Sequence, residues 1–246
     1  MTSSTWPPTT LRSPPLTPRA ASPMMSTRPA LQAPGWSLPC GNKVVPSGWQ
    51  ATLIVAADQD EVEGDLRAGR LGCPPCGGVL RPWGHGRSRV LRRRVGRQDR
   101  FRVRRARCRG CRVTQTLLPE VSLLRRLDDV ETIGAAIEAK AAGQGYGRIA
   151  AELERPKDTV QGWLRAFRRA AEAIRAHFTR WAHALDPLLG PIHPAADPVA
   201  DALSAIGEAA RAAVLALGPR PLWWLVSRLS GGVLLCNATR PLPAVP

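Results

Sequence analysis

Four cysteines in two closely spaced pairs are the residues of this chain with the clearest chemistry. Two residues separate Cys73 from Cys76, two separate Cys108 from Cys111, and 31 residues lie between the pairs. Two Cys-x-x-Cys turns can place four thiolates at the corners of a tetrahedron around one Zn²⁺ ion, which is the usual closed structural site. The sequence therefore predicts a structural zinc ion held by these four side chains.

The spacing of the two pairs and the glycines after the first pair bear on whether the motif can form a zinc site. The gap between the pairs exceeds the commonest zinc-site spacing of about 15–20 residues, but a longer β-hairpin over residues 79–107 accommodates the difference. Gly77 and Gly78 permit the close backbone approach that a metal-binding turn needs.

Cys-Pro-Pro-Cys is also a redox spacing, yet a thioredoxin-like site expects the motif at the start of a helix within a βαβ unit. Here Gly-Gly-Val-Leu-Arg-Pro follows instead.

Arginine dominates the segment between and beside the two cysteine pairs. Residues 81–112 contain fourteen arginines and a single acidic residue, Asp99, and they hold most of the chain's net charge of +16. A charge excess of this size favours polyanionic partners. We expect phosphate contacts to DNA from eight of these arginines: Arg92, Arg93, Arg94, Arg104, Arg105, Arg107, Arg109 and Arg112.

Residues 149–164 have the spacing of a helix-turn-helix. Ile-Ala-x-x-Leu at 149–153 is followed by a three-residue connection and by Thr-Val-x-x-Trp-Leu at 159–164. Small Ala150 lets the helices cross closely. Glu154 stands in the turn where glycine is usual, and Gly162 lowers helix propensity by about 1 kcal/mol relative to alanine. An ordinary helical pair in a bundle remains the alternative. The residues expected to hold the two helices together are Ile149, Leu153, Val160 and Leu164.

Polar residues of the second helix would then face outward, where a recognition helix meets the major groove. These outward residues are Lys157, Asp158, Thr159, Gln161 and Arg165. We expect contacts to base edges from four of them, Lys157, Thr159, Gln161 and Arg165.

Hydrophobic patterns predict the elements around these motifs. A strand at 52–56 and a helix from Asp58 to Gly69 form a small βα element, with Asp58 and Glu61 as a capping box. Strand-like segments at 88–95 and 101–107 predict β-hairpins. A further helix begins with a capping box of Asp128 and Glu131 and ends near Gly143 or Gly145.

Two later helices carry apolar residues at heptad spacing. The first begins at Pro156 and the second covers residues 199–217, so the two can face each other as an αα-hairpin. The apolar positions of the first helix are Leu164, Phe167, Ala171, Ile174, Phe178, Trp181 and Leu185.

The expected fold class is α+β and modular, with a small β zinc ribbon followed by an all-α helix-turn-helix and a helical hairpin. The modules are a disordered Pro/Ser/Thr-rich tail at 1–50, the βα element at 51–70, the zinc ribbon at 71–118, the helix-turn-helix with an extended third helix at 126–185, and the helical return with a C-terminal tail at 186–246. No apolar run approaches the roughly 18–20 residues that a membrane-spanning helix needs. We expect a soluble, cytoplasmic protein.

The combination of motifs resembles a known group of proteins. Cys-Pro-x-Cys-Gly-Gly, the basic hairpin, the arginine-rich approach to the second cysteine pair and the helix-turn-helix are similar to the N-terminal region of bacterial insertion-sequence transposases. They are closer still to an actinobacterial family of unknown function that joins the same modules. The resemblance covers about residues 51–185. It implies that these modules bind terminal inverted repeats, while catalysis belongs to a separate nuclease domain with an acidic triad.

We expect a sequence-specific DNA-binding protein that is not an enzyme and has no catalytic residues. Residues 186–246 contain only four acidic residues, too few and in too short a segment for the nuclease domain. The expected role is transposase-related or that of a mobile-element-associated regulator at the bacterial nucleoid. Duplex DNA is the expected partner, together with a homodimer or a transposase. The alternatives are a zinc-ribbon module that docks protein or RNA, a Cys-x-x-Cys redox protein, and an undetected nuclease.

Overall fold

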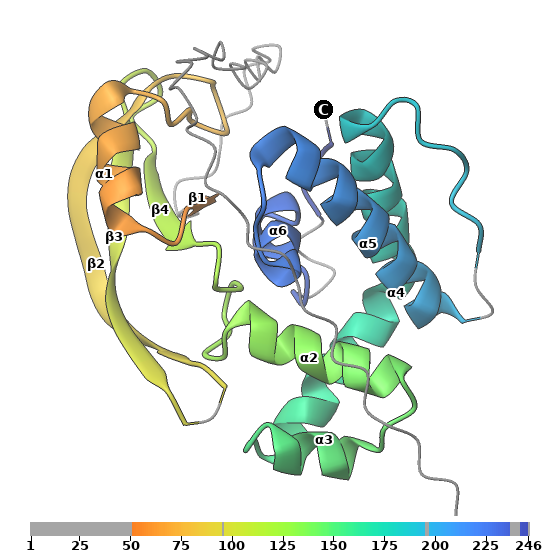
Figure 1. Ribbon diagram of the computed structural model, residues 1–246. Helices are drawn as coiled ribbons and strands as arrows, with labels where there is room; N and C mark the ends of the chain where they lie inside the picture. Colours follow the sequence, from red (N-terminus) through yellow and green to blue (C-terminus); the bar gives the residue numbers. More distant parts are fainter. Residues whose placement is uncertain (1–50, 95, 195–196, 237–241, 246) are drawn as a thin grey trace, which may run out of the picture. The chain divides into compact units, whose positions relative to one another are not determined.

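The computed structural model describes residues 51–94, 96–194, 197–236 and 242–245, and the tail expected at 1–50 lies outside them. The described part contains a four-stranded sheet and six helices, which confirms the predicted α+β class (Figure 1). None of the helices described is both long and apolar enough to span a membrane.

The sheet has the strand order β1-β4-β3-β2, and its strands are β1 (Ala51–Val55), β2 (Leu80–Arg92), β3 (Gln98–Cys108) and β4 (Thr114–Pro119). β2 and β3 form one antiparallel hairpin that is longer than the predicted strand segments, with irregularities between Pro82 and Gly84 and between His85 and Ser88. β1 pairs in parallel with β4. The predicted βα element is therefore part of the same sheet as the hairpin.

Helix α1 (Gln59–Ala68) covers one face of this sheet. The Asp58 carboxylate caps the helix by accepting from the Asp60 backbone N–H at 2.8 Å, and Gly69 ends it in the left-handed conformation. Leu66 of α1 is fully buried against residues of the strands, among them Leu80. This core is small, and it extends directly to two of the cysteines, Cys73 and Cys108.

The second core lies among the helices α2 (Val130–Ala141), α3 (Tyr146–Glu152), α4 (Lys157–Leu185), α5 (Pro198–Leu217) and α6 (Leu222–Leu229). The heptad positions of α4 from Phe167 to Trp181 are buried, and α5 packs along them as the expected αα-hairpin (Figure 1). Small side chains of α5, including Ala202, Ala205 and Ala209, allow the two helices to approach closely.

Helix α6 was not predicted, and it gives the Trp-rich C-terminal segment a role in packing against the other helices. The Trp223 ring lies on α2 at Gly134, where an added Cβ would lie 2.1 Å from the ring. The Trp223 Nε1–H donates to the Glu138 carboxylate at 2.8 Å. Gly134 is therefore buried because it provides space for an aromatic ring, a role that its place in the apolar stripe did not indicate.

The capping residue of α2 differs from the predicted one. Asp129 accepts from the Thr132 backbone N–H at 2.8 Å, so Asp129 and not Asp128 is the N-cap. Asp128 is instead buried and accepts hydrogen bonds from Arg92 and Arg155. By sequence, the two adjacent aspartates were equally suited to capping. The arginines that bind Asp128, and so leave Asp129 to cap the helix, come from distant parts of the chain.

Candidate metal centre and nucleic-acid interface

The four predicted cysteine ligands form one cluster. The sulfur atoms of Cys73, Cys76, Cys108 and Cys111 lie within 4.8 Å of one another, and no other group of His, Cys, Asp and Glu side chains in the described part of the chain has metal-site geometry. The Cys73 and Cys111 sulfurs are 3.6 Å apart, and those of Cys76 and Cys108 are 3.5 Å apart. A tetrahedral ion with metal–sulfur bonds of about 2.3 Å requires sulfur–sulfur separations of about 3.8 Å. The cluster therefore fits a thiolate-bound metal ion.

Two similar backbone turns present the cysteines. The Gly77 backbone N–H donates to the Cys73 carbonyl at 2.7 Å, and Gly77 has a φ of 68°. After the second pair, Arg112 occupies the equivalent left-handed position with a φ of 63°. A Cβ at Gly78 would lie 3.0 Å from the Cys108 sulfur and 3.3 Å from the Cys76 sulfur. The predicted close approach at the first pair is thus confirmed.

The surroundings of the sulfur atoms differ between positions. A hydrogen bond from the Gly78 backbone N–H lowers the pKa of Cys76 to about 7. Burial raises the pKa of Cys73 above its ordinary value. The side chain of buried Gln115 on β4 points its Nε2 at the Cys73 sulfur, 3.9 Å away. Sequence reasoning missed Gln115, because nothing near it in the sequence marks β4 as the strand beside the cluster.

The redox alternative predicts a different arrangement. Cys73 and Cys76 lie in a turn that follows α1, and no helix begins at the motif. The helix start that lowers thiol pKa in thioredoxin-like sites is therefore not present at this pair.

Helices α3 and α4 form a packed pair at the positions predicted for a helix-turn-helix, and α2 packs against both. Ile149, Ala150, Leu153 and Val160 are buried, as predicted. Trp163, and not Leu164, is the fully buried residue in the next turn of α4; Leu164 is only partly buried. Trp163 belongs to a core to which α2 also contributes, which a two-helix pattern could not indicate.

The turn between α3 and α4 has an unusual conformation for its sequence. Glu154 has a φ of 53°, which is the left-handed conformation that favours glycine. Next to it, the Arg155 side chain donates to the carbonyls of Leu153 and Glu154, each at 3.1 Å. It also bonds Asp128 and the carbonyl of Arg93. Arg155 therefore stabilises a turn that contains a strained residue, and sequence reasoning did not single it out.

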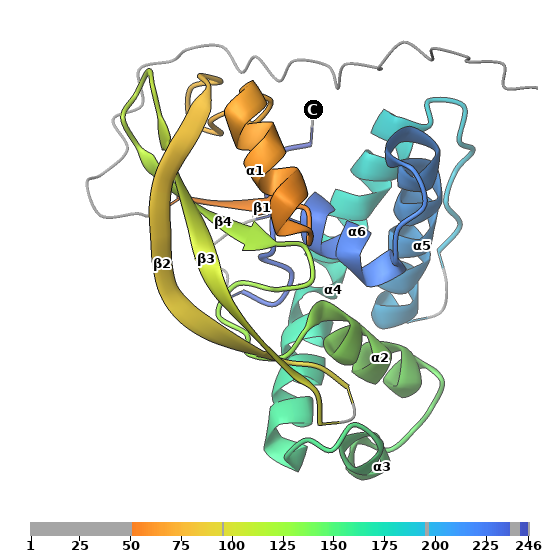
Figure 2. The same ribbon diagram turned by 60° about the vertical axis from the view of Figure 1, so that its left-hand side comes forward.

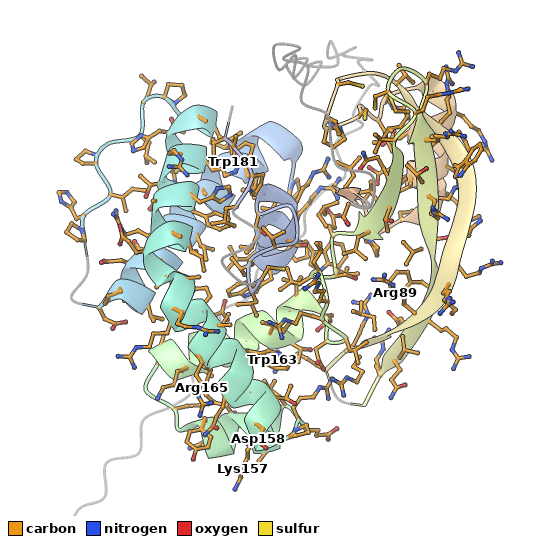
Figure 3. All side chains as sticks on the ribbon, turned by 180° about the vertical axis from the view of Figure 1, so that it is seen from behind. Arg89, Lys157, Asp158, Trp163, Arg165 and Trp181 are labelled. Carbon is orange, nitrogen blue, oxygen red and sulfur yellow. The ribbon has the colours of Figure 1, made fainter. Side chains whose placement is uncertain are left out.

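The predicted base-contacting residues lie together on the first turns of α4. Lys157 and Arg165 are exposed, and Thr159 and Gln161 are half-buried. The Arg165 Nη2 donates to Gln161 Oε1 at 3.3 Å. Figure 3 shows Lys157 and Asp158 at the start of α4, with Trp181 far along the same helix. These side chains are thus available on one end of α4.

The eight predicted phosphate-contacting arginines occupy different environments. Arg92 pairs with Asp128, Arg93 with Asp99 and Asp129, and Arg104 with Glu63. The Arg107 guanidinium lies over the Trp83 ring, 4.5 Å from its centroid, and donates to the Arg112 carbonyl. The other four have no ion pair within the described residues: Arg94, Arg105, Arg109 and Arg112.

Comparison with known proteins gave one family match. Residues 73–163 match the family described as Domain of unknown function (DUF6431). No curated protein and no solved structure matched the chain. The matched stretch begins at Cys73 and ends at Trp163, so it includes all four cysteines and all but the last residue of the segment 149–164. Over this stretch, the chain is similar to a family whose description assigns no function.

Proposed function

We propose that this protein binds duplex DNA at a preferred sequence and places α4 in the major groove. The observation that carries the proposal is the geometry of α3 and α4. Val160 and Trp163 are buried on one side of α4, while Lys157, Gln161 and Arg165 are available to a ligand on its first turns. A recognition helix requires this division between a packed face and a polar face.

The polar side chains of α4 suit base edges. Glutamine pairs well with adenine, and arginine pairs with guanine through two hydrogen bonds. The bond between exposed Arg165 and half-buried Gln161 is 3.3 Å long and accessible to solvent, so base edges can replace it at small cost. In this proposal, Gln161 and Arg165 read sequence, and Lys157 and Thr159 contact neighbouring bases or sugar.

Arginines outside the ion pairs supply the phosphate contacts. Arg94, Arg105, Arg109 and Arg112 have no acidic partner among the described residues, so binding them to phosphate breaks no existing pair. The ion-paired arginines instead maintain the scaffold. Phosphate contacts contribute affinity that depends on salt and little on sequence.

The cysteine cluster holds a structural Zn²⁺ ion in this proposal. Four cysteine donors are typical of structural zinc sites, and the bound ion would cross-link the two cysteine turns. Because the apolar core of the sheet is small, metal binding contributes much of its folding free energy. The ion has no catalytic part, since all four ligand positions are filled by protein.

The biological role that fits this binding activity is transposase-related. We propose a mobile-element-associated DNA-binding factor or regulator, without catalytic residues of its own, acting at the bacterial nucleoid. The resemblance of the cysteine and helix-turn-helix region to insertion-sequence transposases supports this role, and a transposase or a second copy of the chain is the proposed protein partner.

Alanine substitutions on α4 test the base-reading role. Gln161→Ala and Arg165→Ala should each reduce affinity for a selected duplex by about 1–3 kcal/mol, and much less for random duplex. Val160→Asp is the folding control, since it places an unpaired charge in the buried face and should lower helical circular dichroism as well. If both alanine variants keep their fold and the full ratio of specific to random binding, α4 does not read the sequence.

A further inference from the structure

Backbone hydrogen bonds attach the tip of the β2–β3 hairpin, residues 92–94 and 96–98, to the helical part of the chain. The Arg92 N–H donates to the Leu127 carbonyl at 2.7 Å, and the Asp129 N–H donates to the Arg92 carbonyl at 3.0 Å. The Arg155 side chain donates to the Arg93 carbonyl at 2.7 Å. The hairpin tip is therefore attached both to the start of α2 and to the turn of the helix-turn-helix.

The buried Asp128 carboxylate also connects the hairpin tip with the turn between α3 and α4. Asp128 accepts from Arg92 of β2 at 2.8 Å through Oδ2 and from Arg155 of the turn at 2.6 Å through Oδ1. The Asp128 side chain is only 3% exposed. Separating the hairpin tip from the turn would take one of the two arginine partners away from this buried charge, which is unfavourable. These bonds therefore favour one position of the hairpin tip relative to the start of α4.

The hairpin tip continues into exposed, unpaired arginines. The Arg93 N–H donates to the Arg97 carbonyl at 2.7 Å and closes the turn. Arg94 and Arg97 are exposed, and no acidic residue in the described part of the chain pairs with either. A Cβ at Gly96 would lie 3.9 Å from Oε2 of Glu154, so the turn that carries these arginines adjoins the residues before α4. Figure 2 shows the end of the hairpin beside α2 and the start of α4.

We propose that the hairpin tip is a wing of the helix-turn-helix, with Arg94 and Arg97 contacting the phosphate backbone that flanks the groove occupied by α4. The inference rests on the proposed function, since it requires a duplex on α4. Two arginines without acidic partners, fixed beside a recognition helix, complement the charge of that backbone. Because phosphate contacts do not depend on base identity, the wing contributes affinity and orientation but not base specificity.

The test compares two double variants that each remove two positive charges. Arg94→Ala/Arg97→Ala alters the hairpin tip, and Arg87→Ala/Arg89→Ala alters exposed positions of β2 before it that form no ion pair with a described residue. Figure 3 shows Arg89 on the hairpin, on a different element from Lys157. With a short duplex of random sequence, the tip variant should reduce the magnitude of the negative slope of log affinity against log salt by about 2, at about 0.9 per lost phosphate contact. The matched variant should change this slope little.

The outcomes separate the wing from the proposed function. If the wild-type protein binds duplex and the tip variant keeps the same salt slope, the wing is overturned and the DNA-binding proposal stays intact. The same holds if both double variants reduce the magnitude of the slope equally. Wild-type protein that does not bind duplex overturns both. A photo-crosslinking residue at position 98 provides a second measurement, and crosslinks should form with the backbone flanking the region that α4 protects. Crosslinks confined to other regions of the duplex contradict the wing.

Discussion

Replacing Asp128 with asparagine tests whether the hairpin tip and the helix-turn-helix are held as one unit. The asparagine side chain has one acceptor oxygen in place of a carboxylate, so one of two arginines loses its partner. Removing one partner of a buried ion pair costs about 3–5 kcal/mol. The Arg155 side chain is 7% exposed, whereas that of Arg92 is 36% exposed and regains water. Arg155 also keeps three carbonyl acceptors. We therefore expect the lower end of the range, a loss of about 3 kcal/mol.

Denaturant unfolding of the metal-loaded chain, followed by far-ultraviolet circular dichroism, measures this loss. Glu152→Gln is the matched control, because it removes one carboxylate charge from the exposed pair between Arg148 and Glu152 on α3. Exposed pairs at this helical spacing contribute only about 0.3–0.5 kcal/mol. Equal effects of Asp128→Asn and Glu152→Gln would refute the reasoning that Asp128 joins the two parts.

Three further changes follow from the structure. Cys108→Ser should abolish tight metal binding, and chelation should unfold the sheet before the helices, as metal analysis and hydrogen exchange can check, because the sheet has the smaller core. Burial lowers the pKa of the His177 side chain in the folded protein. Below about pH 6.5 this histidine therefore takes up a proton more readily in the unfolded chain, and the stability of the fold decreases as the pH drops through that value. The denaturation midpoint of wild type should therefore fall more on acidification than that of His177→Gln. Gly134→Ala should lower thermal stability by about 1–3 kcal/mol, because the clash with Trp223 exceeds the gain in helix propensity of about 1 kcal/mol.

Local patterns predicted the elements that local interactions determine. The Cys-x-x-Cys spacing predicted four sulfur atoms that the structure places within 4.8 Å of one another. Gly69 ends α1 as the sequence indicated, because a left-handed residue after a helix favours glycine. The heptad spacing of α4 predicted its buried face, since a packed helix shows its contacts in its own sequence.

Interactions between distant segments were beyond these patterns. Arg93 belongs to a run of arginines that suggested phosphate contacts, yet Asp99 and Asp129 pair with it. The function of Arg155 depends on Asp128, 27 residues away in the sequence. Helix α6 was missed because eight residues rich in tryptophan show too few turns for a clear helical period. Each of these features depends on partners that only the folded chain brings together.

Sequencing the duplex fragments that the zinc-loaded full chain retains from a random pool tests the central proposal most directly. We predict that one common sequence is enriched, and that Gln161→Ala relaxes the preference at one position of it while leaving the rest unchanged. Enrichment of no common sequence, or equal retention of RNA and duplex DNA, would contradict sequence-specific binding through α4.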